Sequence, residues 1–351
     1  MLFGLLLVMV GVLSPSPLVG GTTIAQQTLC NRTCSALSRS EGRHDFRKIG
    51  CALLDTRLAS SVSPFLCGDL PKHPLFEYYL RMETAFLNDV LSHPSFRVSI
   101  GVIFKLGDNG TLSTSSERYL YNEGLAFLSQ AHVIVPTELR KLYILQPDFN
   151  FIHTKGFRSL IARMTQGCPP FRSRAKVVFW RGSSTSRVGP TCDAVPRVRM
   201  CNNAESMSWV DAKITKYLRF CSNRDSSVPQ VPEVEWCQRR GIVDIDGNAF
   251  AWGLFWRLAS GSAVFRVESS FDCSYCGELR PWVHYVPISR SLDDMSRSTS
   301  VILNESHSAE LIQMTRRARN LIDRHTYDKE VVRVVGALNH FSTKRLQRKR
   351  Q

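Results

Sequence analysis

The sequence predicts an α/β fold with two sheets, and three observations support this prediction. The β-branched runs Gly241–Ile245 and Ala263–Val267 flank a stretch in which apolar side chains recur at helical spacing from Phe250 to Leu258. A strand, a helix and a second strand joined by short links form the repeating unit of a parallel sheet. Strand-like and helix-like runs also alternate in the first half of the chain, which predicts a second sheet there. The chain has 351 residues, enough for two domains with a sizeable core.

The composition indicates a globular protein with a basic surface. Hydrophobic residues make up 43 % of the chain and charged residues 21 %, a balance that excludes a disordered protein. The 45 basic and 30 acidic residues give a net charge of +15. This excess favours anionic partners without choosing among a nucleotide-sugar, a membrane surface, a sulfated glycan and a nucleic acid. The final run Lys344–Arg350 is expected to be a solvated tail that would also suit a membrane surface.

The start of the chain and its cysteines indicate the secretory pathway. The apolar run Leu2–Leu13 is followed by proline, serine and small residues, which is typical of a cleaved signal peptide over residues 1–24. It lacks a basic n-region, so a short uncleaved anchor is the alternative. Eleven cysteines favour an oxidising lumen of the endoplasmic reticulum or Golgi, or secretion, and an odd number leaves at least one thiol unpaired. Asn31, Asn109 and Asn304 begin glycosylation sequons, and these secretory features argue against a nucleic-acid partner.

Residues 25–160 are expected to form a cysteine-containing α/β domain on the acceptor side. Four cysteines in a polar context predict a disulfide-held region, because the paired spacing of a zinc site is absent. Leu125–Leu128 and Val133–Val135 are interpreted as a helix followed by a strand, and Leu142–Ile152 as a further apolar run. The remaining features of this half are the cysteines Cys30, Cys34, Cys51 and Cys67, a helix at Leu75–Leu91 and a strand at Arg97–Leu106.

Asp108 is the candidate catalytic residue of this half. It lies in the turn Gly107–Gly110, directly after the predicted strand Arg97–Leu106. Ligands of open α/β sheets gather at the carboxyl ends of the strands, so a carboxylate there is well placed for chemistry. The alternative is an aspartate chosen for its backbone hydrogen bonds in a turn. Asp148 is the second candidate, although it is expected to close a structural turn.

Residues 161–305 are expected to form a second α/β domain, entered through the linker Gly167–Pro170. The strand Lys176–Arg181 runs into the hydroxyl-rich loop Gly182–Ser186, which could offer N–H and O–H donors to a phosphate or could be a surface turn. Asp246-Gly247-Asn248 is predicted to join a strand directly to a helix. The unpaired N–H groups of a helix start would then form an anion site, and the alternative is an ordinary capped turn.

Several other residues of this half can be interpreted as functional or as structural. Asp244 and Asp246 form a D-x-D pair that could hold a divalent cation. Cys273 and Cys276 form a CxxC motif, for which a disulfide is favoured over a redox site. Glu268 follows a strand and could accept ribose hydroxyl hydrogen bonds, or be a solvated acid. Trp282 is expected in the core and His284 in a structural role. Residues 306–351 are expected to form two core-packing amphipathic helices before the basic tail.

Five blocks in this half occur in an order that resembles a known family. Together they resemble the Rumi-like and capsule-associated glycosyltransferases, glycosyltransferase family 90, over Lys176 to Phe341. This resemblance implies a GT-B-like arrangement of two Rossmann-like domains that face a cleft. It also implies inverting, metal-independent and cofactor-free transfer from a UDP-sugar of the glucose or xylose type to a hydroxyl of a protein or glycan. The blocks are WRGSST at 180–185, DGNAF at 246–250, SGSAV at 260–264, LRPWVHYVP at 279–287 and SLDD at 291–294.

The resemblance also implies roles for individual residues. Asp108 takes the position of the catalytic base. Relatives carry an arginine on the helix where this chain has Trp252-Gly253, and Arg257 one turn later would be its substitute. If nothing replaces that arginine, the chain could be an inactive relative that binds glycan, protein or UDP without transfer. The residues expected at the donor are Ser183, Arg187, Arg197, Gly247, Asn248, Ala249, Phe250, Arg257 and Glu268.

Overall fold

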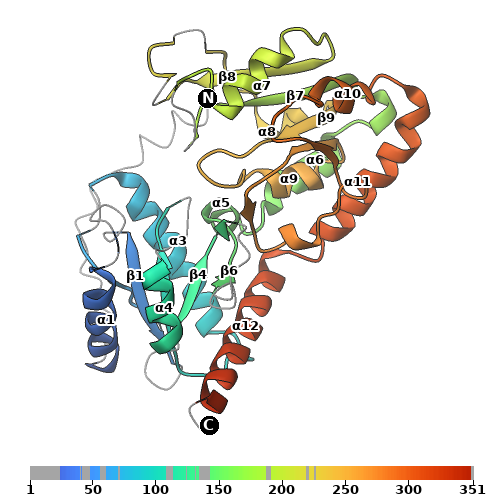
Figure 1. Ribbon diagram of the computed structural model, residues 1–351. Helices are drawn as coiled ribbons and strands as arrows, with labels where there is room; N and C mark the ends of the chain where they lie inside the picture. Colours follow the sequence, from blue (N-terminus) through green and yellow to red (C-terminus); the bar gives the residue numbers. More distant parts are fainter. Residues whose placement is uncertain are drawn as a thin grey trace, which may run out of the picture. The chain divides into compact units, whose positions relative to one another are not determined.

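The computed structural model (Figure 1) describes most of the chain from residue 24 onward. Several features named above lie outside the described residues: the run Leu2–Leu13, Asp108, the sequon at Asn109, Arg187 and the end of the basic tail. None of the helices in the described part is long and apolar enough to cross a membrane. The described ranges are 24–39, 41, 48–55, 61–69, 72–107, 114–123, 125–130, 132–133, 143–186, 191–218, 221–224 and 227–348.

The chain divides into two compact units. One comprises Met1–Leu106, Leu112–Phe127 and Val335–Gln351, and the other comprises Gly107–Thr111 and Leu128–Val334. The predicted boundaries near residues 160 and 305 stay predictions. Where the sequence suggested a passage between domains before Gly167, the structure has a helix, α6 (Arg158–Gly167), followed by a disulfide between Cys168 and Cys237.

The first unit is built on a sheet in which β1 pairs antiparallel with β2 and β3. The sheet order is β2-β1-β3-β4-β6. Gly50 faces Phe104 across the β1–β3 pair, and a Cβ at Gly50 would collide with that ring, so glycine is needed there. The disulfides Cys30–Cys51 and Cys34–Cys67 confirm the predicted disulfide-held region. Its elements are α1 (Ile24–Leu37), β1 (Ile49–Leu54), β2 (Phe65–Leu66), α3 (Pro74–Leu91), β3 (Ile100–Lys105), α4 (Thr114–Glu123), the start of β4 (Ala126–Ser129) and the end of α12 (Tyr327–Arg348).

Two expectations for this half need correction. Leu125–Leu128 was expected to be helical, but Ala126–Ser129 is strand β4 and all four of its residues are buried. A short apolar run buried on both faces has no periodicity that separates strand from helix. The run from Leu142 to Ile152 is also two elements, β6 (Tyr143–Leu145) and α5 (Phe149–His153).

The second unit contains a parallel sheet with the order β12-β10-β9-β7-β8. Its central strands are buried around Phe179, Trp180 and Phe265. Its other elements include β5 (His132–Val133), which pairs with β11, and the start of α12. The elements of the sheet region are β7 (Ala175–Ser183), α7 (Pro196–Ala204), β8 (Val210–Lys216), α8 (Glu233–Trp236), β9 (Arg239–Asp244), α9 (Leu254–Ala259), β10 (Ala263–Val267), β11 (Phe271–Asp272), η4 (Cys276–Glu278), β12 (Val286–Ile288), α10 (Met295–Ser300) and α11 (Ser308–Ile322).

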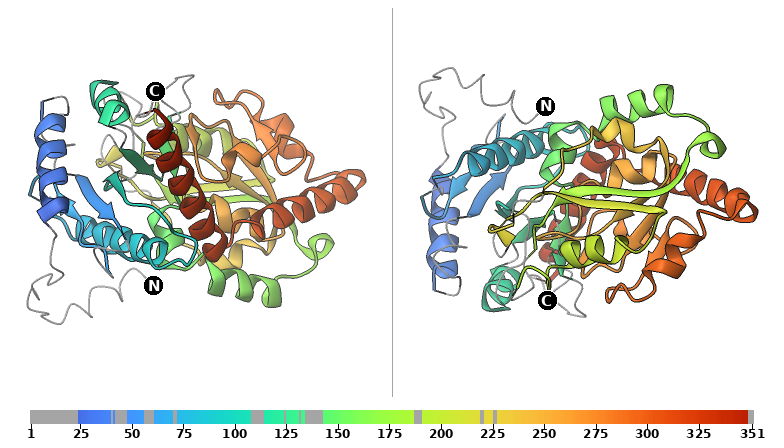
Figure 2. Two further views of the ribbon diagram at one scale, coloured as in Figure 1. Left: turned by 90° about the horizontal axis from the view of Figure 1, so that it is seen from below. Right: turned by 90° about the horizontal axis from the view of Figure 1, so that it is seen from above.

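The order of these strands creates a switch point between β7 and β9. The chain moves from β7 outward to β8 on one side, and from β9 outward to β10 and β12 on the other. Right-handed crossovers in opposite directions place helices on opposite faces of a sheet. Accordingly, α7 packs on β8, whereas α9 packs on β9 and β10 together with α6 and α11 (Figures 1 and 2). The α/β prediction and the two C-terminal helices, α11 and α12, are confirmed.

The predicted helix start at Asp246-Gly247-Asn248 is wrong. Helix α9 begins only at Leu254 and has 6 residues, with Gly253 at its N-cap. The intervening stretch is irregular, and the side chains of Ala249 and Phe250 turn into the core at 2 % and 4 % exposure. Residues 246–248 therefore do not offer an anion the unpaired N–H groups of a helix start. Whether this turn can bind an anion depends on its own contacts.

Candidate functional site

The switch point places two loops side by side at the carboxyl ends of β7 and β9. One loop follows Ser183, and the other contains Asp246, Gly247 and Asn248. Neighbouring strands here send their connections to opposite faces, so the two loops diverge at the position where open α/β sheets bind ligands; we call this position the crevice.

Arg197, in the first turn of α7, ties the two loops together. Its Nε donates to the Asp246 carbonyl oxygen (2.9 Å) and its Nη2 to the Ile245 carbonyl oxygen (3.0 Å). Its Nη1 donates to the Ser183 carbonyl oxygen (3.2 Å) and to Thr185 Oγ1 (2.8 Å). The guanidinium is therefore directed at protein oxygens in both loops and fixes their separation.

Gly247 leaves the room that this clamp needs. A Cβ at this position would lie 2.9 Å from both Arg197 Nη2 and Thr185 Oγ1. Real Cβ atoms essentially never come this close, so any side chain at this position would have to displace the Arg197 guanidinium or the Thr185 hydroxyl. The Thr185 hydroxyl accepts from Arg197, and these contacts leave its own proton for another partner.

The structure brings together four of the residues expected at the donor. Ser183, Arg197, Gly247 and Asn248 all lie at the crevice and are partly exposed. Ala249 and Phe250 are buried beneath it and contribute packing and backbone groups.

Arg257 lies in the core behind these loops. Its Nη1 bonds Asp244 Oδ1 at 2.5 Å, and its side chain is 10 % exposed. Its guanidinium carbon lies 5.4 Å and 5.2 Å from the rings of Trp236 and Trp256. A Cβ at Gly253 would lie 3.0 Å from that carbon, so the guanidinium fills the space beside the Gly253 backbone. The glycine at the helix start and the arginine one turn later are thus coupled by packing.

The two carboxylates of the D-x-D pair have different partners. Asp244 holds Arg257, whereas Asp246 Oδ2 accepts from Ser269 Oγ at 2.8 Å. Burial raises the pKa of Asp246 to about 6, and the nearby Asp244 adds to this effect. Within the described residues, no group of three or more histidine, cysteine, aspartate or glutamate side chains could hold a metal ion.

A cavity of about 600 Å³ opens at the carboxyl ends of β10 and β12. Glu268 and Ser269 follow β10, and Ser289 follows β12, so the cavity shares the sheet edge with the crevice. The Asp246–Ser269 hydrogen bond joins the two regions. The cavity is lined by Arg266, Glu268, Ser269, Phe271, Asp272, Cys276, Gly277, Leu279, Pro281, Tyr285, Pro287, Ile288, Ser289 and Asp294.

The charges of the cavity and the crevice differ. The cavity has three carboxylates, Glu268, Asp272 and Asp294, against one cation, Arg266. Carboxylates accept hydrogen bonds but repel a phosphate, so the cavity suits a neutral ring that carries hydroxyl groups. The crevice carries the Ser183 and Thr185 hydroxyl groups beside the Arg197 guanidinium and suits an anion better.

Arg266 is the residue of this site that the sequence analysis missed. It is 8 % exposed, and its Nε, 3.9 Å from Asp244 Oδ2, has no hydrogen-bond partner in the described structure. The sequence feature that could have identified it is the presence of an arginine within the apolar strand Ala263–Val267, because burying a charge in a strand costs free energy.

The other sequence candidates are also placed. Asp148 caps α5 by accepting from the Phe151 N–H (2.9 Å), and burial raises its pKa to about 7. Trp282 is 51 % exposed, so its expected core position is wrong, and its backbone has a φ of 62°. His284 accepts from the Arg280 N–H, as expected for a structural role.

All eleven cysteines lie in the described part of the chain. Cys273 and Cys276 form the expected disulfide at the cavity wall, and Cys192 pairs with Cys221. Cys201 is the unpaired cysteine, and burial raises the pKa of its thiol to about 12. It is therefore a packed thiol and not a reactive one.

Comparisons with known proteins relate this chain to glycosyltransferases. The profile of glycosyl transferase family 90 matches residues 140–349. Protein O-glucosyltransferase 2 of Danio rerio is 27 % identical over 161 residues, which cover 43 % of this chain and 31 % of the relative. Protein O-glucosyltransferase 1 of Rattus norvegicus is 26 % identical over 130 residues, covering 36 % and 31 %. The O-glucosyltransferase rumi of Drosophila pseudoobscura pseudoobscura is 25 % identical over 166 residues, covering 46 % and 39 %.

The aligned part spans between 31 % and 39 % of the length of these curated relatives. The family profile covers the whole parallel sheet of the second unit, with both the crevice and the cavity.

Proposed function

The chain belongs to glycosyl transferase family 90, and from this membership we propose that it transfers the sugar of a UDP-sugar to an acceptor hydroxyl. The observation that carries this proposal is the meeting of the Ser183 loop, Arg197 and the Gly247 turn at the switch point of the parallel sheet. Such a switch point, with hydroxyl groups and an arginine on its loops, fits the diphosphate of a nucleotide-sugar.

In this proposal the charged and the neutral parts of the donor bind to different parts of the site. The diphosphate would lie on the hydroxyl and N–H groups of the crevice, where Ser183, Asn248 and the predicted Arg187 stabilise the leaving charge. A neutral, hydroxyl-bearing ring would extend toward the cavity, where Glu268 accepts its hydrogen bonds. In this arrangement Arg197 holds the loops, and Arg257 supports them from the core through Asp244.

The remaining parts of the proposal rest on the family resemblance. Asp108 would act as general base on the acceptor hydroxyl, and the transfer would invert the anomeric centre without a metal. The two α/β units would face a cleft as in the GT-B arrangement. The relatives are protein O-glucosyltransferases, so a glucose-type donor and a protein acceptor are the first to try. The five disulfides favour a secretory lumen as the place of action.

The direct test is UDP release by the purified chain from a panel of UDP-sugars, with and without acceptors. We expect turnover with one donor type and its loss in Asp108→Ala, while UDP still binds to the variant. Turnover that survives Asp108→Ala would place the base elsewhere. Activity lost to EDTA and restored by manganese would contradict the metal-free mechanism and would favour a divalent cation site at Asp244 and Asp246.

A second candidate function is UDP or glycan binding without transfer. Two arginines near the site, Arg197 and Arg257, are directed at protein oxygens, so they contribute less charge to a leaving diphosphate than an arginine aimed into the crevice would. UDP binding without turnover on any donor or acceptor would favour this function, and robust transfer would exclude it.

A further inference from the structure

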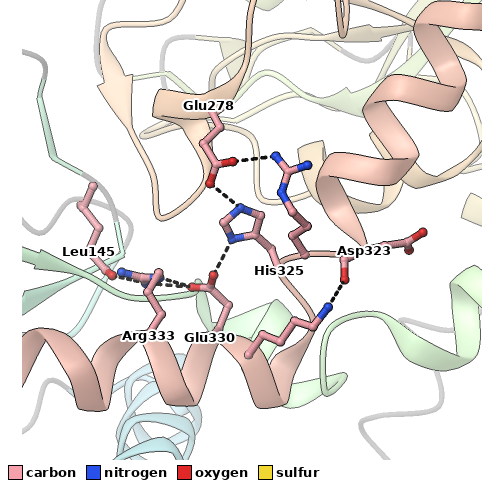
Figure 3. A network of polar contacts seen from close by, with 8 residues as sticks. Leu145, Glu278, Asp323, His325, Glu330 and Arg333 are labelled. Carbon is pink, nitrogen blue, oxygen red and sulfur yellow. Dashed lines mark hydrogen bonds and ion pairs between the residues drawn. The ribbon is translucent and has the colours of Figure 1, made fainter.

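His325 lies between two carboxylates in the loop that joins α11 to α12 (Figure 3). Its Nδ1 is 2.7 Å from Glu330 Oε1, and its Nε2 is 2.8 Å from Glu278 Oε1. The histidine side chain is 7 % exposed. Both ring nitrogens are therefore bound to carboxylate oxygens at short distances inside the second unit.

This arrangement fixes the protonation of the ring. Ionised carboxylates only accept hydrogen bonds, and a neutral imidazole has one donor and one acceptor nitrogen. A neutral ring would turn one nitrogen lone pair toward a carboxylate oxygen. Both contacts are satisfied together only when the ring is an imidazolium with two N–H donors.

Both carboxylates are held in the ionised form. The hydrogen bond from Arg324 at 2.8 Å is the main cause that lowers the pKa of Glu278. Burial alone would raise the pKa of Glu330, but the hydrogen bond from His325 and the charge of Arg333 outweigh burial and lower it. Apart from these residues, the Tyr275 ring packs against the histidine at a centroid distance of 5.9 Å, and burial raises the pKa of its hydroxyl well above the usual value.

Losing the hydrogen bond between His325 and Glu330 costs more free energy than losing the one between His325 and Glu278. The Glu330 side chain is 2 % exposed and cannot be rehydrated, whereas the Glu278 side chain is 48 % exposed and can exchange the histidine for water. When the ring loses one proton, the remaining N–H therefore stays on Nδ1 with Glu330, and the Glu278 contact is released.

Glu278 ends a segment that forms one wall of the cavity. It is the last residue of η4, and its neighbours Cys276, Gly277 and Leu279 line the cavity while Glu278 itself points to His325. The start of the segment is fixed by the Cys273–Cys276 disulfide. The contacts with His325 and Arg324 hold its other end, and the histidine contact is the one that depends on a ring proton.

We propose that His325, acting through Glu278, is a positioning residue that holds the cavity wall in place as an imidazolium and releases it when the ring becomes neutral. Its effect on catalysis rests on the proposed function, because the cavity is then part of the donor site. Ligand binding in the cavity is favoured on the acidic side of the ring's titration and weakens as the pH rises through it. At much lower pH the clamp is lost again, when Glu278 and Glu330 are protonated.

The protonation claim is tested on the full chain by NMR of ¹⁵N-labelled histidine. We expect one ring to carry protons on both nitrogens while Glu278 and Glu330 are ionised, and to become the Nδ1–H tautomer when it loses one proton. Glu278→Gln, which can donate an amide N–H to Nε2, identifies this ring by its response. A ring that is neutral while both carboxylates are ionised, or that becomes the Nε2–H tautomer, would overturn the proposal.

The positioning claim is tested by the pH dependence of Glu278→Gln against Arg324→Gln. Glu278→Gln replaces the carboxylate that accepts from His325, whereas Arg324→Gln removes the arginine that donates to Glu278. Only in Glu278→Gln can a histidine ring with a single proton keep both of its hydrogen bonds. We expect the thermal stability of the wild type relative to Glu278→Gln to fall over the pH range in which the ring loses its second proton. Arg324→Gln should keep the pH profile of the wild type.

The same variants are then compared for donor KM and kcat. The wild-type KM should rise about fivefold over that pH range with little change in kcat, and the KM of Glu278→Gln should stay flat. Parallel KM profiles for wild type and Glu278→Gln would overturn the positioning role. If no donor turns over while the NMR and stability results hold, the proposed function fails and the histidine clamp stands.

Discussion

Arg197 is the residue on which the geometry of the crevice depends most. Its fork donates to Asp246, Ile245, Ser183 and Thr185, and a lysine ammonium cannot reproduce this planar set of donors. We expect Arg197→Lys to lower the free energy of unfolding by about 2 kcal/mol and to weaken UDP binding about tenfold. Urea denaturation and calorimetric UDP titration measure the two effects.

Arg199→Lys is the matched control, because Arg199 lies on the same helix and bonds the exposed Arg290 carbonyl. It should change neither quantity by more than about 0.5 kcal/mol. If Arg197→Lys bound UDP as tightly as the wild type, the clamp would have no role in the donor site.

Asp246 makes the stability of the second unit depend on pH. Because burial raises its folded-state pKa from 3.8 to about 6, the folded protein binds this proton more tightly than the unfolded chain does. The sign follows from linkage: the cost of ionising Asp246 is absent below about pH 4, grows between about pH 4 and 6, and is complete above that range.

Asp246→Asn removes this cost and keeps an oxygen for Ser269. We expect the variant to gain about 2 kcal/mol relative to the wild type between pH 4 and pH 8, as measured by denaturation at both values. A stability difference that is the same at both values would show that Asp246 does not titrate in this range.

At the scale of single elements, the start of α9 depends on the fit between Gly253 and Arg257. A Cβ at residue 253 would lie 2.9 Å from Trp256 Nε1 and 3.0 Å from Arg257 Cζ. We expect Gly253→Ala to push the guanidinium off Asp244 and to lower the free energy of unfolding by about 1–2 kcal/mol, despite the higher helix propensity of alanine.

Gly336→Ala is the control for that substitution, because a Cβ at Gly336 meets nothing within 4 Å in helix α12. It should stabilise the protein by up to about 1 kcal/mol. Equal effects of the two alanines in urea denaturation would show that Arg257 does not depend on the space at residue 253.

The elements that the sequence predicted well are those with a long or clean pattern. The β-branched strands around Gly241 and Ala263 and the helices α11 and α12 have such patterns, and all were found. The sequence predictions are wrong for two kinds of segment. Strand β4 is a short buried run without a hydrophobic period, and the buried residues Ala249 and Phe250 have apolar spacing like that of a helix but lie in an irregular stretch.

For the whole molecule, the ordered motifs were enough to predict the family, and the family profile confirms it. They predicted Ser183 and Gly247 at one site because strand ends of a parallel sheet meet at one edge, and the family resemblance added Arg197 as one of two candidate arginines. They could not show that Arg197 and Arg257 bond protein oxygens, since partner choice depends on three-dimensional packing. Asp272 and the His325 clamp were likewise out of reach, because their neighbours come from distant parts of the chain.

The central claim is that the donor binds at the switch point of the parallel sheet, and Gly247 tests it most directly. Calorimetric titration of UDP into wild type and Gly247→Ala measures this, with Gly336→Ala as the control for an added methyl group. The account predicts that the wild type and the control bind UDP alike, and that Gly247→Ala binds at least about tenfold more weakly because its Cβ displaces Arg197 and Thr185. Undiminished UDP binding by a folded Gly247→Ala variant would contradict a donor site in this crevice.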